Sequence, residues 1–310
     1  KLIRSKPELI AENCRKRNVN VDIENLLKLD EKVRQTTTEV DSFRQSRNDI
    51  SNKMKGNLSA EERQPLIEES KQLRDQEAEK ESVLRELTEQ RLELLKQVPN
   101  LTHPDSPEGL TDEDNQPIRK MGTIPEFDFE PKDHVELMEA LDLIDFDGGA
   151  KVSGQKFYFL KNQAVFLELA LANYALDLLQ KEGFTVHMTP DLARHQILDG
   201  IGFNPRGEET QIYSVEDFDL CLIATAEITL GGLLVDQVLD PERLPIMYAG
   251  FSHCYRTEAG AAGRESRGLF RVHQFSKVEM FAFTHPDQSE EMHQKMLAIE
   301  EQIYQDLGIP

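Results

Sequence analysis

The sequence contains no tryptophan, only three cysteines and no long apolar run. Cys14, Cys221 and Cys254 are odd in number and far apart, which favours neither a disulfide framework nor a cysteine metal site. We therefore expect free, buried thiols in a reducing compartment. No apolar run approaches the ~18 residues of a membrane-spanning helix, and the first residues lack a signal-peptide core. These absences predict a cytoplasmic protein with no membrane partner, and 310 residues leave room for two domains.

Acidic residues outnumber basic ones in the second part of the chain, residues 99–310, but not in the first. The formal net charge is −21. Residues 1–98 carry 20 Lys and Arg against 20 Asp and Glu, whereas residues 99–310 carry 16 against 37. Acidic surface repels nucleic acid, but the stretch from Ser252 to Lys277 holds five basic residues against two glutamates. The charge pattern therefore permits RNA binding at a few contacts without predicting it.

The segment from Ile246 to Phe283 predicts two strands joined by a loop. The loop, Ala259 to Gly268, has three glycines and no apolar residue larger than alanine. The flanking runs alternate with a period of two, so every second side chain points to the same face. The residues expected to share a face are Ser252, Cys254, Arg256 and Glu258 in the first strand and Arg271, His273, Phe275, Lys277 and Glu279 in the second.

Two interpretations of this strand pair stay open. If the two marked faces coincide, their arginines, aromatic ring and carboxylates suit a ligand with a phosphate, a planar base and an ammonium group. The alternative is a surface hairpin with solvated charges, which periodicity alone favours. The histidines His253, His273 and His285 have no spacing typical of a metal site, so we expect core or surface histidines.

The first part of the chain predicts a coiled coil. Residues 26–54 and 66–98 carry apolar residues at spacings of three and four. In the short link between them, Ser59 and Glu62 have the spacing of a capping box. We therefore predict an antiparallel helical hairpin, an arm about 40 Å long. Its seam includes polar residues such as Arg47, so packing stabilises it only modestly, and the pattern alone favours a dimerisation or spacer coiled coil.

A linker and alternating helices and strands are predicted between these two regions. Residues 99–126 contain five prolines, which is typical of a domain boundary. We expect a helix at Gln163–Glu182 and then a strand that ends before Pro190. Further expectations are turns at Gly148, Gly149 and Gly154, a strand at Lys156–Leu160, a helix at Asp191–Leu198, a polar loop at Gly200–Tyr213, a strand at Asp219–Ile228 with a helix from about Thr229, and a helix at Gln288–Leu307.

The segment YRTEAGAAGRESRGLFRVHQFSKVE, residues 255–279, resembles motif 2 of the class II aminoacyl-tRNA synthetases, and specifically of the seryl-tRNA synthetases. VDSFRQSRNDISNKM resembles the first helix of that family's arm, and PNLTHPDSPEG resembles its connector. The helix and strand before Pro190 resemble motif 1, although Pro190 by itself is equally an ordinary strand terminator. The resemblance covers most of the chain and stops before the family's third motif, so we expect a C-terminally incomplete enzyme.

This resemblance implies an α+β fold in which an antiparallel two-helix coiled-coil arm precedes an antiparallel β-sheet catalytic domain flanked by helices. The implied domains are a tRNA-binding domain at residues 1–98 with its arm at about 26–98, a linker at 99–126 and a catalytic domain at 127–310. The implied activity is that of a serine–tRNA ligase. It activates L-serine with ATP to seryl-adenylate and transfers serine to tRNA(Ser), with tRNA(Sec) as a further candidate.

The implied partners are tRNA(Ser), L-serine, ATP with Mg²⁺, and a second copy of the chain that forms a homodimer near Pro190. The family's Mg²⁺ ligands lie beyond the matched part, so no protein metal site is expected here. Two alternatives remain. One is a catalytically incomplete paralogue that acts as a tRNA- or protein-binding module. The other is a structural coiled-coil protein, which the motif 2 match disfavours.

The resemblance also assigns residues. Arg256 is the expected catalytic residue, because a planar guanidinium suits both the α-phosphate of ATP and the carboxylate of serine. The ATP-binding set is Arg256, Thr257, Glu258, Arg271, Val272 and Phe275. The serine-binding set is Thr225, Ala226, Glu227 and Glu279, although a glutamate at a helix N-terminus is by itself usually a favourable dipole pairing. The tRNA-binding set is Arg34, Arg44, Arg47 and Lys53.

Overall fold

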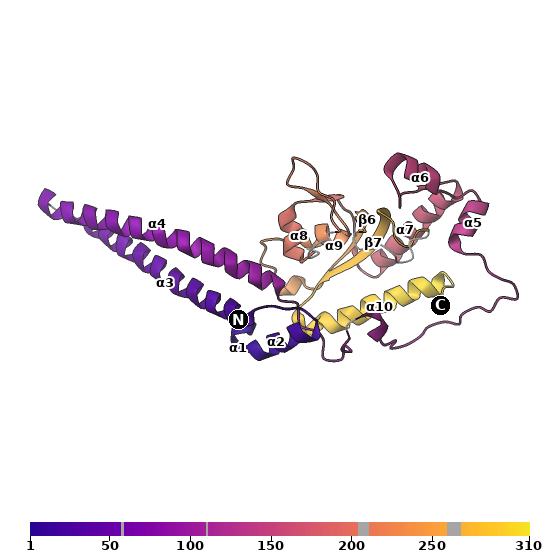
Figure 1. Ribbon diagram of the computed structural model, residues 1–310, viewed down its shortest axis with the longest axis horizontal. Coiled ribbons are helices and arrows are strands. Elements are labelled where there is room, and N and C mark those ends of the chain that lie inside the picture. Colours follow the sequence, from indigo (N-terminus) through magenta and orange to yellow (C-terminus); the bar gives the residue numbers. More distant parts are fainter. Residues whose placement is uncertain (57–58, 110, 204–210, 259–267) are drawn as a thin grey trace. The chain divides into compact units, whose positions relative to one another are not determined.

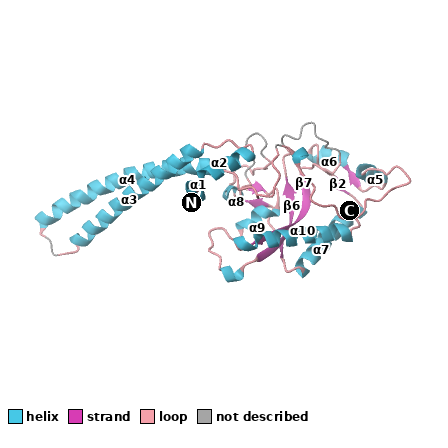
Figure 2. Cartoon of the chain, turned by 90° about the horizontal axis from the view of Figure 1, so that it is seen from below, coloured by secondary structure: helices cyan, strands magenta, loops and turns pink. Residues whose placement is uncertain are grey.

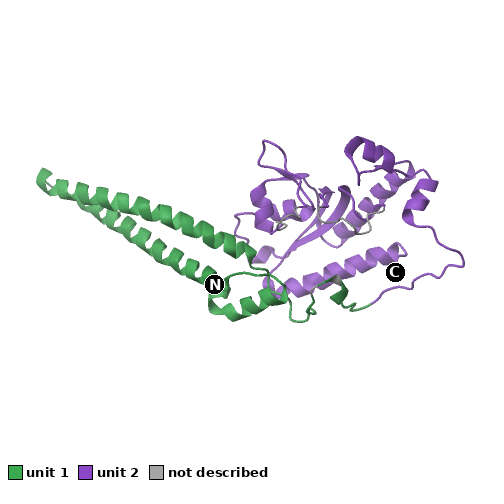
Figure 3. Ribbon diagram, in the orientation of Figure 1, with its two compact units in different colours: residues 1–119 green, residues 120–310 purple. Residues whose placement is uncertain are grey.

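The structure, a computed structural model, describes residues 1–56, 59–109, 111–203, 211–258 and 268–310. The chain divides into two compact units, residues 1–119 and residues 120–310, which Figure 3 shows in different colours. In the described part of the chain, no helix is both long and apolar enough to cross a membrane.

The first unit is built on a helical hairpin (Figures 1 and 2). Its elements are α1 (Leu2–Ser5), α2 (Pro7–Lys16), α3 (Ile23–Met54), α4 (Ala60–Gln97) and the short η1 (Asp112–Asp114). Asp22 caps α3 by accepting the backbone N–H of Asn25 at 2.9 Å. Ser59 and Glu62 form the predicted capping box at the start of α4. The predicted two-helix arm is therefore confirmed.

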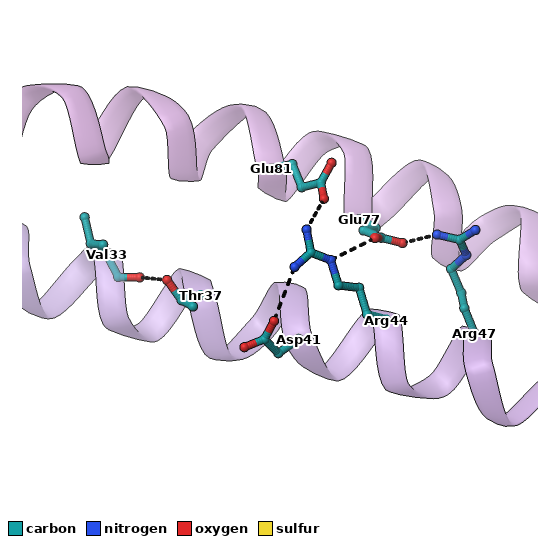
Figure 4. A network of polar contacts seen from close by, with 7 residues as sticks. All are labelled: Val33, Thr37, Asp41, Arg44, Arg47, Glu77 and Glu81. Carbon is teal, nitrogen blue, oxygen red and sulfur yellow. Dashed lines mark hydrogen bonds and ion pairs between the residues drawn. The ribbon is translucent and has the colours of Figure 1, made fainter. Parts of the chain in front are cut away.

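The seam of the arm mixes apolar side chains with a buried ion-pair network. The apolar contribution of α3 consists of Leu26, Leu29, Val33, Val40 and Ile50. Glu77 of α4 is only 7% exposed, and it accepts hydrogen bonds from Arg47 and, at 3.3 Å, from Arg44 (Figure 4). Arg44 also reaches Glu81 at 2.6 Å. The hydrogen bond from Arg47 lowers the pKa of the Glu77 carboxyl below its ordinary value.

The second unit combines a three-stranded sheet with helices and two short strand pairs. Its elements are α5 (His134–Ala140), β1 (Ile144–Asp145), α6 (Phe146–Ser153), β2 (Phe159–Leu160), α7 (Gln163–Lys181), β3 (Thr185–Met188), β4 (Leu192–Ala193), α8 (His195–Ile201), β5 (Cys221–Leu222), α9 (Ala226–Gly232), η3 (Pro241–Arg243), β6 (Ile246–Tyr255), β7 (Gln274–Phe283), η4 (Pro286–Gln288) and α10 (Ser289–Asp306). In the main sheet β3 runs parallel to β6, and β6 runs antiparallel to β7. β1 pairs with β2 and β4 with β5, both antiparallel. The predicted α+β class is confirmed.

Helices α7 and α10 cover one face of the main sheet. The core there joins Leu178 and Leu179 of α7, Ala249 of β6, Val278 of β7 and Ile299 of α10. The opposite face carries those residues of the period-two pattern that lie inside the strands. Arg256, Glu258, Arg271 and His273 were predicted in the strands but lie outside them, because β6 ends at Tyr255 and β7 begins at Gln274. Cys254 lies opposite Phe275, Ser252 opposite Lys277 and Gly250 opposite Glu279. The two marked faces therefore coincide, as one of the two interpretations required.

The prediction for residues 219–228 was wrong in two respects. The strand is limited to Cys221–Leu222, and α9 begins at Ala226 instead of near Thr229. Thr225 has the extended φ of −170° and ψ of 151° of an N-cap residue. The backbone N–H of Glu227 finds its acceptor in Glu279, 2.9 Å away and 52 residues later in the chain. A tertiary contact therefore fixes the start of this helix.

Three further predictions, made from local sequence patterns, also need correction. The predicted helix at Asp191–Leu198 begins only at His195, because the N–H of Ile223 donates to the carbonyl of Asp191 and β4 pairs with β5. Gly148 and Gly149 lie inside α6, not in a turn. A Cβ on Gly149 would lie 2.3 Å from the Phe157 carbonyl oxygen, so close packing requires this glycine. The strand predicted at Lys156–Leu160 is limited to Phe159–Leu160.

Two predicted loops lie partly outside the described residues. Residues 204–210 of the polar loop at Gly200–Tyr213 and residues 259–267 of the glycine-rich loop at Ala259–Gly268 are not described. The first loop was predicted to begin too early, because Gly200 and Ile201 still belong to α8. The three cysteines are free and buried, as predicted.

Gly250 allows α9 to pack directly against β6. A Cβ at this position would lie 2.9 Å from both Ala226 Cβ and Leu230 Cδ1. We expect Gly250→Ala to lower the free energy of unfolding by about 1–3 kcal/mol, because overpacking forces neighbouring atoms to shift. Thermal unfolding followed by circular dichroism measures this change.

The matched control is Gly200→Ala in α8, where an added Cβ meets nothing within 4 Å. There, removing the backbone entropy of a helical glycine should leave stability unchanged or raise it by up to about 1 kcal/mol. Equal stability of Gly250→Ala and the wild type would contradict the tight contact between β6 and α9.

Candidate active site

The candidate site lies on the face of β6 and β7 that α9 partly covers. On this face Ser252 and Cys254 are buried, and Ser252 Oγ lies 3.6 Å from Cys254 Sγ. Burial raises the pKa of the Cys254 thiol, which therefore stays protonated at neutral pH. These two residues are the buried part of this face, next to the more exposed charged groups.

The residues predicted to bind serine are brought together by one hydrogen-bond network. The Thr225 hydroxyl donates to Glu279, and the backbone N–H of Glu227 donates to Glu279 Oε2 at 2.9 Å. Lys277 Nζ joins the network, 2.7 Å from Thr225 Oγ1 and 2.8 Å from Glu279 Oε1. Ala226 is fully buried in the first turn of α9. Sequence reasoning placed Lys277 on this face but gave it no role.

The Glu227 carboxyl occupies an environment that resists its ionisation. Burial raises its pKa first, and the neighbouring Glu279 charge raises it further, while Lys277 opposes both effects. Two carboxylates with one ammonium between them leave one net negative charge when all three are ionised. A positively charged group of a ligand would therefore be favoured beside them.

Arg256 lies at the other end of this face. Its guanidinium carbon is 5.1 Å from the centre of the Phe275 ring, and its Nε donates to the carbonyl of Ala224 at 3.4 Å. Its backbone is fixed on both sides, because its N–H donates to the His273 carbonyl and its own carbonyl accepts from His273 Nδ1 at 2.9 Å. Within the described residues, no carboxylate pairs with Arg256.

Glu258 and Arg271, which both belong to the predicted ATP-binding set, form an ion pair with each other. Arg271 Nη1 lies 3.2 Å from Glu258 Oε2, and the Glu258 side chain is only 9% exposed. Glu258 has a left-handed φ of +49°, which is uncommon outside glycine, asparagine and aspartate. Its N–H donates to Gln211 Oε1 at 2.9 Å, a contact that holds this conformation.

The remaining predicted ATP-binding residues lie beside this ion pair. Val272 is buried, with 5% of its surface exposed, and Thr257 is held through its backbone N–H by the Gln211 carbonyl at 3.3 Å. Sequence reasoning missed Gln211, because it lies in a polar loop without a recognisable motif. Its contacts with the N–H groups of Thr257 and Glu258 connect that loop to the segment after β6.

In the ranges that the structure describes, no group of three or more histidine, cysteine, aspartate or glutamate side chains could hold a metal ion. His253 instead contacts Asp191, whose Oδ2 lies 3.0 Å from His253 Nδ1.

The predicted tRNA-binding residues of the arm differ in their contacts. Arg44 and Arg47 point toward Glu77 (Figure 4), and Arg34 pairs with Asp30 of its own helix at 3.3 Å. Lys53 is exposed and makes no ion pair with any residue that the structure describes. The four residues therefore do not form one cationic surface.

Comparisons with known proteins agree on one family. Residues 1–102 match the family model for the seryl-tRNA synthetase N-terminal domain, and residues 213–310 match that for the tRNA synthetase class II core domain (G, H, P, S and T). A serine–tRNA ligase from Treponema denticola is 49% identical over 310 residues, all of this chain and 74% of the relative. One from Rubrobacter xylanophilus is 53% identical over 308 residues, 99% of this chain and 73% of the relative.

Solved structures give the same result. The crystal structure of seryl-tRNA synthetase from Pyrococcus horikoshii complexed with ATP has a TM-score of 0.84 and 36% identity, and the match covers 99% of this chain and 74% of that one. The cytoplasmic serine–tRNA ligase from Naegleria fowleri in complex with AMP has a TM-score of 0.79 and 29% identity, covering 97% and 70%. The chain described here thus spans about three quarters of these relatives. It belongs to the seryl-tRNA synthetase family of the class II aminoacyl-tRNA synthetases.

Proposed function

We propose that this protein activates L-serine with ATP to seryl-adenylate and then transfers serine to tRNA(Ser). The observation that carries the proposal is the polar face of β6 and β7. One end has a net negative network around Glu279, and the other has Arg256, which has no carboxylate partner among the described residues. The ATP and AMP bound by the two solved relatives support a nucleotide at this site.

In the first step, an oxygen of the serine carboxylate attacks the α-phosphorus of ATP. The new oxygen–phosphorus bond gives seryl-adenylate, the bond to the β-phosphate breaks, and pyrophosphate leaves with its electron pair. The substrate is itself the nucleophile, so the protein needs to align the two reactants and to balance the developing charge. No nucleophilic side chain is required.

Arg256 is the residue that we assign to the reacting groups. Its planar guanidinium can donate to an oxygen of the α-phosphate and to one of the serine carboxylate together, which a lysine ammonium does less well. Its side chain lies over the Phe275 ring in the structure. Adenine stacking on this face of Phe275 therefore requires the guanidinium to move aside, and the phosphate supplies the charge that draws it.

Glu258 and Arg271 are assigned to the two ends of ATP. In the structure each neutralises the other at 3.2 Å. The distal phosphates carry more negative charge than one carboxylate and compete for Arg271, and Glu258 is then released toward the adenine. Mg²⁺ would accompany ATP and would add charge neutralisation at the phosphates.

Selection for serine follows from the acceptor capacity of Glu279. A carboxylate aimed at the serine hydroxyl loses a hydrogen bond when alanine binds instead. Sites built around a substrate hydroxyl reject the analogue without it by about 10⁴-fold or more. The ammonium of serine would lie against the negative charge that Glu227 and Glu279 share.

The second step requires tRNA, for which we propose the arm as the docking element. Arginine and lysine contacts to phosphates fix the register of an RNA without reading its bases. Of the four predicted arm residues, Lys53 is the one without an ion pair among the described residues, whereas the other three are paired, so we assign the contact to Lys53. tRNA(Sec) is a further candidate acceptor for the same adenylate.

We also propose a homodimer through the segment that resembles motif 1. Phe166 of α7 is 69% exposed and Met188 of β3 is 82% exposed. Such exposed apolar side chains on neighbouring elements are typical of an interaction surface.

Replacing Arg256 by alanine should nearly abolish serine-dependent ATP–pyrophosphate exchange. Removing a charge-stabilising donor typically costs about 100- to 1000-fold in rate, so we expect at least that loss in kcat/KM. Arg243→Ala is the matched control, because Arg243 is exposed in η3 away from this face. Retained exchange in Arg256→Ala would remove Arg256 from this role. Absence of exchange in the wild type would instead favour the catalytically incomplete paralogue.

Lys53→Ala should weaken tRNA binding without changing the stability of the arm. Each phosphate contact contributes about 0.7–0.9 to the slope of log K against log salt, so the slope should fall by that amount. Arg47→Ala should instead increase hydrogen exchange along α3 and α4, because it leaves Glu77 with one partner fewer. An unchanged salt slope in Lys53→Ala would exclude Lys53 from the tRNA contact.

The wild type should sediment as a dimer at micromolar concentration, and Phe166→Glu should shift it toward the monomer. A carboxylate on this exposed helix surface would have to be buried without a partner in the dimer. Val238→Glu is the matched control, because Val238 is fully exposed outside the motif 1 segment. A wild-type monomer at micromolar concentration would contradict the proposed dimer.

A further inference from the structure

We propose that Lys277 is a positioning residue of the serine pocket, which orients the Thr225 hydroxyl and leaves Glu279 one acceptor position for the substrate. This inference rests on the proposed activation of serine. No role was assigned to Lys277 by its sequence pattern. The geometry around its ammonium group carries the argument, because the group contacts two residues of the predicted pocket at hydrogen-bond distance.

The direction of each hydrogen bond in the network follows from the chemistry of the lysine. An ammonium can only donate, so Thr225 Oγ1 accepts from Lys277 Nζ at 2.7 Å. The single hydroxyl proton of Thr225 is then free to donate to Glu279 Oε2. Without Lys277, this hydroxyl could turn and act as donor or acceptor elsewhere. Lys277 therefore determines which way Thr225 points.

The same network fixes how much of Glu279 remains for a ligand. An ionised carboxylate has about four acceptor positions. Three donors from the described residues contact Glu279: Lys277 Nζ at Oε1, and the Thr225 hydroxyl and the Glu227 N–H at Oε2. About one position is left, on the side of Oε1. Glu279 can thus accept one hydrogen bond from serine, which suits its hydroxyl.

The ammonium of serine then needs another acceptor, and Glu227 is the available group. Its carboxylate accepts no side-chain hydrogen bond from any residue that the structure describes, and it lies beside Glu279 at the first turn of α9. With Lys277 in place, Glu227 and Glu279 retain one net negative charge, which equals the charge of one ammonium. Lys277 thus sets the net charge of the pocket to a value that one cationic group of a ligand neutralises.

Among the described residues, the charged groups that act on the Glu227 carboxyl are Glu279 and Lys277, both on β7. The same two groups also act on the Cys254 thiol of β6. Burial and Glu279 raise the pKa of Glu227, and Lys277 lowers it. Glu227 must be ionised to hold an ammonium. Loss of Lys277 would raise the pKa of Glu227 further. As the pH falls, serine binding would therefore weaken at a higher pH than in the wild type.

The test compares Lys277→Met and Lys277→Arg with the wild type in serine-dependent ATP–pyrophosphate exchange between pH 6 and 9. We expect Lys277→Met to raise the KM for serine by about 10- to 100-fold, the range for a lost charged hydrogen bond. The KM for ATP should change less than about twofold. In a plot of kcat/KM for serine against pH, the decrease on the acid side (the acid limb) should move to higher pH. Lys277→Arg keeps the cation and should restore the acid limb.

Two controls separate positioning from simple loss of structure. Lys295→Met removes another half-exposed, ion-paired lysine of the same unit, on α10 beside Glu182, and should leave both KM values unchanged. Binding of a non-hydrolysable seryl-sulfamoyl adenosine analogue, measured by calorimetry, should weaken in Lys277→Met at an unchanged melting temperature.

An unchanged serine KM and acid limb in Lys277→Met would overturn the inference. So would equal losses for serine and ATP, which indicate a structural role. A wild type without serine-dependent exchange would refute the proposed function itself, and this outcome is read from the wild type alone.

Discussion

The contact between Glu279 and the first turn of α9 links the candidate site to the rest of the second unit. The first N–H groups of a helix have no acceptor within the helix. Thr225 makes no capping bond of its own, and the carboxylate of Glu279 accepts the Glu227 N–H instead. A shift of β7 by one residue would turn Glu279 to the opposite face. The strand register, the start of α9 and the composition of the pocket therefore depend on one another.

In the arm, buried ion pairs contribute to the packing of two helices. Glu77 is buried between two helices and holds Arg44 and Arg47, so these arginines contribute to the seam. A buried carboxylate that loses its partners is costly, because its desolvation is no longer compensated. This explains how a hairpin with a polar seam can still pack in one register. It also means that a count of basic residues overestimates the positive charge that the arm presents to RNA.

The sequence predicted the parts of the fold that local patterns determine. The two arm helices, the capping box at Ser59 and the strand pair around Ser252 and Lys277 follow from spacings of two to seven residues. The starts of α8 and α9 could not be predicted in this way. They depend on the pairing of Asp191 with Ile223 and on a carboxylate 52 residues away.

In the candidate site, too, local patterns predicted some features, and contacts between distant residues determine the others. The period-two pattern correctly placed Phe275, Lys277 and Glu279 on one face, because a strand repeats every two residues. It could not show that Arg271 pairs with Glu258, since both lie outside the strands and Glu258 adopts a left-handed φ. The bridge from Lys277 to Thr225 likewise joins residues 52 positions apart.

Three cations among the described residues at this site, Lys277, Arg271 and Arg256, differ in whether a carboxylate neutralises them. Lys277 is held by Glu279 and Arg271 by Glu258, whereas Arg256 has no carboxylate partner in the part of the chain that the structure describes. In a segment of the chain with a large excess of acid, an unpaired arginine is a strong local attraction for an anion. The network around Glu279 attracts a cation over the same face. A substrate pair with phosphate at one end and an ammonium at the other satisfies both ends at once, and neither ATP nor serine alone does so.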